Sequence, residues 1–146
     1  MLIHRLIGAL VVLILITQPV HADRIFVKES NAGLLSGTWE GRRTLDTVHQ
    51  AWTGETAVTV TITEGPPRSA SFVTDDQRSW HSRVHIVDGD VLMDAWWVPR
   101  TFALFRMDSE TLLLEAQWEF HHRIWGLTEI NLRVTKTGYD KTLLQD

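Results

Sequence analysis

Histidines on one strand-like segment are the residues whose type and spacing best suit chemistry. His81, Arg83 and His85 alternate along it, so an extended strand would place all three on one face. The two histidines would then be about 13 Å apart, since each residue advances about 3.3 Å. One zinc ion holds its histidine nitrogens at about 2.0–2.1 Å, so another strand would have to contribute His121 or His122. We rank His81, His85 and His121 as weak metal candidates and favour a solvent-facing row of imidazoles.

One carboxylate lies inside an apolar run. Asp94 belongs to the segment 91–98 (VLMDAWWV) and is in phase with Trp96. A carboxylate on an apolar face needs a partner or has a raised pKa. Two interpretations stay open: a buried ion pair with Arg43 or Arg106, or a group that orients a ligand.

Motifs of established catalytic sites are missing from the sequence. It has no serine nucleophile elbow, no phosphate-binding glycine loop and no dinucleotide fingerprint. It also has no cysteine, which excludes thiol nucleophiles, iron–sulfur clusters and cysteine-based zinc sites. We therefore lean against an enzyme and expect no cofactor.

The seven tryptophans are the next candidates. Trp118 alternates with apolar residues and fits a core, whereas Trp96 and Trp97 are consecutive and would face opposite sides of a strand. Exposed aromatic side chains often mark binding surfaces, here a ligand mouth, a platform for sugar rings or a protein-docking patch. Our candidate ligand-binding residues are Trp39, Trp52, Asp94, Trp96 and Trp118.

Elements with a period of two must position these residues. Segments 57–63, 112–120 and 128–135 alternate apolar and polar side chains, which is typical of antiparallel sheets. Turn signals, among them Asp88-Gly89-Asp90 and Pro99-Arg100, separate the strands. We expect eight strands at about 36–44, 57–63, 69–74, 80–87, 91–98, 101–107, 112–120 and 127–136. The longest linker, 45–56, would hold a helical turn or a lid.

Sequential strands with short linkers favour an all-β fold. Closing them as an eight-stranded antiparallel up-and-down barrel removes unpaired edges. Eight strands enclose an interior that side chains fill or that holds one small ligand. A two-sheet sandwich is the alternative.

The N-terminal segment predicts export. Arg5 precedes an uninterrupted apolar run of 11 residues at 6–16, the length of a signal-peptide core rather than of a membrane span. Val20 and Ala22 fit the small-residue rule for cleavage before Asp23. We expect a signal peptide at 1–22, a single domain at 23–146 that is secreted or periplasmic, and no membrane span after cleavage; an uncleaved anchor is the alternative.

Charge argues against one class of partner. The chain carries 14 Lys and Arg against 18 Asp and Glu, a net charge of −4. Phosphate backbones are bound by clustered basic side chains, and the longest basic run is Arg42-Arg43. We expect no nucleic-acid partner.

The opening strand carries a family resemblance. Gly37-Thr38-Trp39 resembles the Gly-x-Trp motif of the calycin superfamily, which includes lipocalins, fatty-acid-binding proteins and avidins. The resemblance implies a barrel that Trp39 closes at one end, with a basic residue of the last strand, Arg133 by position, packed across it. It does not imply a particular ligand.

Together these features predict an exported barrel that binds a small apolar or amphipathic ligand. One alternative is a protein-interaction or inhibitor domain that uses exposed Trp and His side chains. The other is a small histidine-based metal protein or enzyme.

Overall fold

The computed structural model describes residues 23–48 and 54–144. Trp52 and the predicted signal peptide 1–22 lie outside the described residues. Within them, strands and two short 3-10 helices (η) make up the regular structure: β1 (Asp23–Ile25), η1 (Ala32–Leu35), β2 (Gly37–Thr47), β3 (Gly54–Thr63), β4 (Ser69–Thr74), β5 (Ser79–Arg83), β6 (His85–Val87), β7 (Asp90–Ala95), β8 (Val98–Arg106), β9 (Thr111–His122), β10 (Gly126–Thr137) and η3 (Lys141–Leu144).

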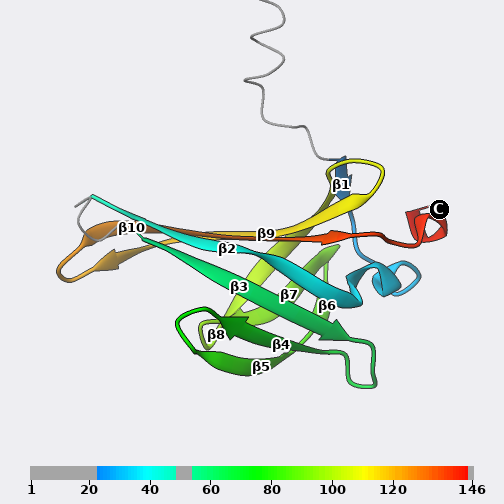
Figure 1. Cartoon of the computed structure of the whole chain (residues 1–146), viewed down its shortest axis with the longest axis horizontal. Helices are drawn as coiled ribbons and strands as arrows, with labels where there is room; N and C mark the ends of the chain where they lie inside the picture. Colours follow the sequence, from blue (N-terminus) through cyan, green and yellow to red (C-terminus); the bar gives the residue numbers. More distant parts are fainter. Residues whose placement is uncertain (1–22, 49–53, 145–146) are drawn as a thin grey trace, which may run out of the picture.

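The strands form a nearly closed antiparallel barrel (Figure 1). Neighbours in the sheet follow the order β5-β4-β3-β2-β10-β9-β8-β7-β6, and the short β1 pairs with β8. Strands adjacent in sequence pair from β2 to β5 and from β6 to β10, and β10 also pairs with β2. The all-β class and the barrel are confirmed.

The predicted count of eight strands is wrong, because nine strands follow one another in the described sheet. The expected strand 80–87 is broken at Val84, where the chain changes partners: β5 pairs with β4, and β6 pairs with β7. Val84 itself is buried, and its backbone N–H donates to the Arg68 carbonyl at 3.0 Å. This donor is therefore satisfied outside the ladder of β5 and β6.

Side chains close the seam at the two sheet edges. The backbone N–H of Asp94 in β7 donates to Ser82 Oγ in β5 at 2.8 Å. Trp80 Nε1 in turn donates to the Asp94 carbonyl at 3.1 Å. These two bonds satisfy backbone groups that the missing ladder would leave unpaired.

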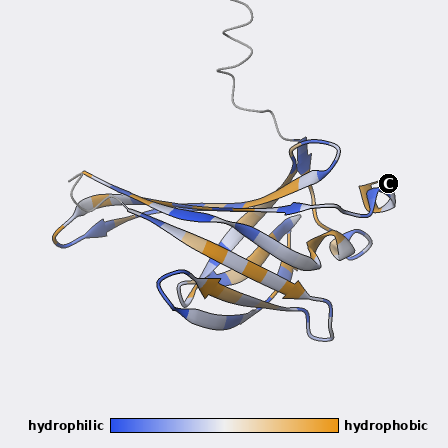
Figure 2. Cartoon of the chain, in the orientation of Figure 1, coloured by the Kyte–Doolittle hydropathy of each residue, from blue (hydrophilic) through white to orange (hydrophobic). Residues whose placement is uncertain are grey.

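Alternation of side chains builds the core inside the barrel, as the orange and pale residues along β3 in Figure 2 show. Val58, Val60 and Ile62 point inward and are buried, as the period of two predicts. Phe72, Phe102 and Leu104 have no accessible surface at all. A water-sized hollow would expose the side chains around it, so this part of the interior is filled.

Trp39 is buried at the end of the barrel beside η1. Its side chain is 0% exposed, and its Nε1 donates to the Leu35 carbonyl at 2.8 Å. The ammonium of Lys136 lies 5.1 Å from the centre of the Trp39 ring. It also donates to the carbonyls of Leu34 and Ser36, at 2.6 and 2.5 Å.

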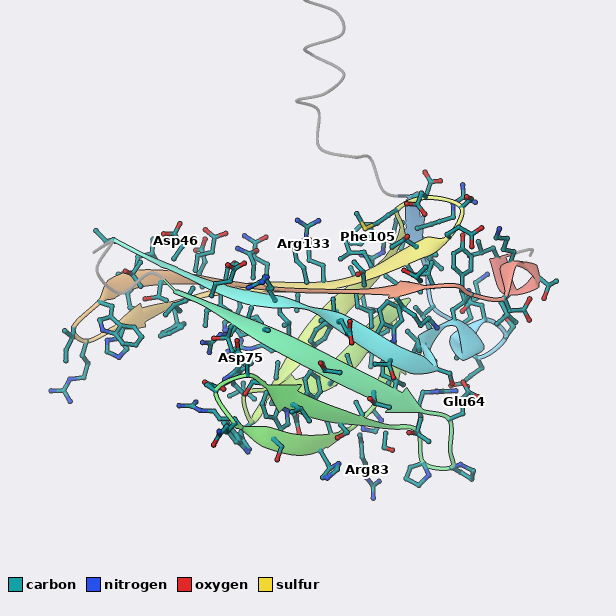
Figure 3. All side chains as sticks on the ribbon, in the orientation of Figure 1. Asp46, Glu64, Asp75, Arg83, Phe105 and Arg133 are labelled. Atoms are coloured by element: carbon teal, nitrogen blue, oxygen red, sulfur yellow. The ribbon has the colours of Figure 1, made fainter. Side chains whose placement is uncertain are left out.

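The prediction that Arg133 packs across Trp39 is wrong. Arg133 is on the side of the sheet turned away from the barrel (Figure 3), where it pairs with Glu115 at 2.8 Å. Side chains alternate along β10, and Lys136 shares the inward phase of the buried Val134. Lys136 is therefore the residue that reaches the closed end.

Four strands extend past the barrel at the opposite end. Figure 1 shows β2, β3, β9 and β10 projecting to the left as an arm. The linker predicted at 45–56 is shorter than expected, since β2 continues to Thr47 and β3 begins at Gly54. No helix among the described residues has the length and apolar character needed to cross a membrane.

Replacing Lys136 by methionine should destabilise the fold by about 2 kcal/mol, because two carbonyls lose a charged donor and the Trp39 ring loses its cation. Urea unfolding measures the change in the free energy of unfolding. Lys141→Met is the matched control, because Lys141 is exposed and pairs only with the exposed Glu110. Equal effects of the two substitutions would show that Lys136 does not hold the closed end.

Candidate functional site

Two arginines point into the barrel at the end opposite Trp39, which we call the mouth. It lies at the β4–β5 and β7–β8 turns, away from η1 (Figure 1). Arg43 in β2 shares the inward phase of Trp39, and Arg100 in β8 shares that of the buried Phe102.

Arg43 rests on a tryptophan ring. Its guanidinium carbon lies 4.4 Å from the centre of the Trp96 ring, and one terminal nitrogen donates to Thr56 Oγ1 at 3.0 Å. The Nε atom is buried and has no hydrogen-bond acceptor. Burial lowers the pKa of Arg43, and the charge of Asp76 at the β4–β5 turn partly opposes this. Asp76 is itself 3.7 Å from Arg78.

Arg100 repeats the arrangement on the other side. Its guanidinium carbon lies 4.6 Å from the centre of the Trp118 ring, and its buried Nε also lacks an acceptor. Among the described residues neither Arg43 nor Arg100 forms an ion pair. Six other arginines do: Arg24, Arg42, Arg68, Arg78, Arg106 and Arg133. Both cations of the mouth thus lie over aromatic rings without an ion pair, although the charges of Asp76 and Asp75 act on Arg43.

The turn that carries Trp96 has a costly backbone. Trp96 and Trp97 are the two central residues of the β7–β8 hairpin, with φ of +53° and +64°. Such two-residue turns prefer Asn-Gly, because left-handed backbone costs other residues about 1–2 kcal/mol each. The predicted strand break at Pro99-Arg100 is wrong. Both residues lie inside β8, and the turn is formed by Trp96 and Trp97 instead.

Ring contacts hold this turn in place. Trp80 lies 4.9 Å from Trp96 and 5.1 Å from Trp97 between ring centres, and it stacks on Phe72 at 4.8 Å. The indole nitrogen of Trp96 is buried without an acceptor. Strained backbone and an unsatisfied polar atom at one place are typical of functional sites.

Apolar side chains extend from the arginines onto the arm. Trp118 pairs with Ile130 across β9 and β10, and Ile130 pairs with Leu45 across β10 and β2. Phe120 continues the inward row of β9 two residues further out and is partly exposed. The site thus consists of two arginines at the mouth and a strip of apolar side chains that leads from them along the arm.

The structure distributes the predicted ligand-binding residues differently from the expectation. Trp96 and Trp118 come together with the arginines at the mouth. Trp39 is sealed in the closed end, and Trp52 lies outside the described residues. Of the five predicted ligand-binding residues, only Trp96 and Trp118 lie at the mouth, because Asp94 lies elsewhere, as described next.

Asp94 lies on the outer side of the wall, so the phase predicted for it is wrong. Val91, Met93 and Ala95 are the buried residues of β7, and Asp94 alternates with them. It forms no ion pair with Arg43 or with Arg106, which binds Asp23 at 2.9 Å. Asp94 lines an outer groove of about 590 Å3 along the seam.

The histidine candidates do not gather. His81 and His85 line the same outer groove as Asp94, whereas His121 and His122 line a separate hollow at the arm tip. In the part of the chain that the structure describes, no group of three or more His, Asp or Glu side chains is placed to hold a metal ion.

Comparison with known proteins found no matching family model, no matching curated protein and no matching solved structure. The chemistry of the site therefore has to be argued from its own residues.

The strain at Trp97 predicts an unusual ranking of substitutions. Trp97→Gly and Trp97→Val both remove the contact with Trp80, but only glycine adopts φ of +64° without steric cost. The glycine variant should be the more stable by about 1–2 kcal/mol in denaturant unfolding. If valine were equal or better, the turn would not have the strained backbone described above.

Proposed function

We propose that this protein binds a small amphipathic molecule with an anionic head group at the barrel mouth. The observation that carries the proposal is the pair of inward-facing arginines, each on a tryptophan ring and neither paired with a carboxylate. The sequence analysis predicted a small apolar or amphipathic ligand, and the arginines add that its head group is negatively charged.

An anion is the partner that these arginines lack. A guanidinium presents Nε–H and terminal N–H donors as a planar fork, which matches a carboxylate or phosphate. Leaving a buried cation unpaired is costly, so a bound anion would both satisfy the Nε donors and neutralise the charge. The protein as a whole is acidic, with a net charge of −4. Attraction of an anion thus depends on the local pair and not on the overall charge.

The position of the apolar tail follows from the packing. The lower interior is filled by Phe72, Phe102 and Leu104, which have no accessible surface. A tail would therefore extend outward from the head group, over Trp118 and Phe120 along the arm. This arrangement differs from that of a ligand enclosed completely inside a hollow barrel.

The calycin resemblance and export belong to the same proposal. The Lys136 ammonium over the Trp39 ring supports the resemblance, because a basic residue of the last strand closes the plugged end as the superfamily pattern implies. The pattern of residues 1–22 supports export, so we place the binding activity in a secreted or periplasmic protein.

Isothermal titration with laurate and with dodecyltrimethylammonium, both below micelle formation, tests the head-group preference. The two molecules have tails of equal length and opposite charge. We expect laurate to bind and the cationic amphiphile to bind at least about tenfold more weakly, the factor expected from a charged hydrogen bond to each arginine. Equal affinities would contradict an anion site.

Substitution of the arginines tests their role. Arg100→Leu should weaken laurate binding about tenfold or more, since one bidentate donor is lost. Arg42→Leu is the matched control, because Arg42 neighbours Arg43 but faces outward and pairs with Glu55 at 3.5 Å. Laurate affinity that falls equally in both variants, or in neither, would contradict the assignment.

A further inference from the structure

Apolar side chains lie at the end of the arm, which we call the arm tip: Val48, Phe120, Ile124, Trp125 and Leu127. Trp125 is half-buried, and the other four are exposed. Ile124 is 72% exposed, Val48 68% and Leu127 45%. Val48 directly follows β2, and the others belong to the β9–β10 hairpin. A methyl group built on Gly126 would lie 3.8 Å from Val48, so the hairpin and the end of β2 are in contact.

The hairpin presents these residues in an ordered turn. His122 Nδ1 accepts hydrogen bonds from the backbone N–H groups of Ile124 and Trp125, both at 3.1 Å. The His122 ring stacks on Trp125 with 4.0 Å between ring centres, and Gly126 allows the turn with φ of +74°. These contacts fix the conformation of the turn, so the Ile124 side chain stays exposed to solvent.

Charge distinguishes the arm tip from the rest of the molecule. Residues 120–128 contain Arg123 and two histidines but no Asp or Glu, although acidic residues outnumber Lys and Arg 18 to 14 in the whole chain. An anionic surface would find the guanidinium of Arg123 here, whereas Glu119 and Glu129 are paired across β9 and β10 just behind this segment. A cationic surface would find no partner among these residues.

We infer that the arm tip docks on a lipid surface that contains anionic head groups. Apolar and aromatic side chains flanked by basic ones are the composition that partitions into the membrane interface, and tryptophan favours that interface. The tip comprises the β9–β10 turn and the residue after β2, at the far end of the arm (Figure 1). Acyl chains yield around such a projection, whereas a protein partner would need a matching pocket.

Docking would bring the mouth to the lipid surface, because the arm extends from that end of the barrel (Figures 1 and 3). An amphipathic ligand would then pass between the lipid layer and the strip of Trp118 and Phe120. This consequence rests on the proposed function, but docking itself does not.

The absence of cysteine allows a local test. A cysteine introduced by Ile124→Cys is labelled with the polarity-sensitive dye NBD and mixed with vesicles of phosphatidylcholine and phosphatidylglycerol at 3:1. We expect its emission to rise about threefold or more as the dye leaves water. Thr61→Cys, on the exposed outer wall of β3, is the matched control and should not respond. Phosphatidylcholine vesicles should give a smaller rise at position 124.

A second variant separates insertion from a labelling effect. Leu127→Glu in the Ile124→Cys background should abolish the rise while laurate affinity is unchanged, so failure of docking and failure of ligand binding are distinguishable. Unchanged emission with both kinds of vesicle would overturn the inference. So would a rise without vesicles that grows with protein concentration, because it would assign the arm tip to contact between two copies of the chain.

Discussion

The pairing of β2 with β10 is the constraint on which the rest of the structure depends. It joins the first and last long strands, so a linear series of hairpins becomes a barrel. The same pairing brings Lys136, near the end of β10, to Trp39, near the start of β2. The Lys136 ammonium then contacts the Trp39 ring and also binds backbone carbonyls that precede Trp39 in the chain. Loss of that contact would destabilise this end of the barrel.

Unequal strand length follows from this closure and creates the site. β2, β9 and β10 are longer than the barrel wall needs, so their far ends form the arm. Large side chains fill the plugged half, and Arg43 and Arg100 occupy the other. Their partners are the rings of Trp96 and Trp118, which satisfy charge without satisfying the Nε donors. The fold thus seals one end with apolar side chains and places two guanidinium groups without an ion pair at the other.

Local patterns predicted the barrel well, because alternation marks strands such as 57–63 directly. The mouth was harder to predict. Arg43 was one of two possible ion-pair partners of Asp94, and Arg100 was placed in a turn, since Pro99 was taken as a strand break and Trp96-Trp97 lacks any turn signal. The phase of Asp94 failed because two apolar residues flank it on each side. The inward orientation of Arg43 could have been predicted, because Arg43 and Trp39 are four residues apart on one unbroken strand and therefore face the same side.

The most direct test of the central claim is NMR observation of the arginine Nε–H groups during titration with laurate. The account predicts that the Nε–H signals of Arg43 and Arg100 shift as laurate binds, because each donor gains an acceptor. The signal of Arg106, whose guanidinium already pairs with Asp23, should stay in place. Saturable laurate binding that leaves the Arg43 and Arg100 signals unmoved would contradict the claim that these two residues hold the head group.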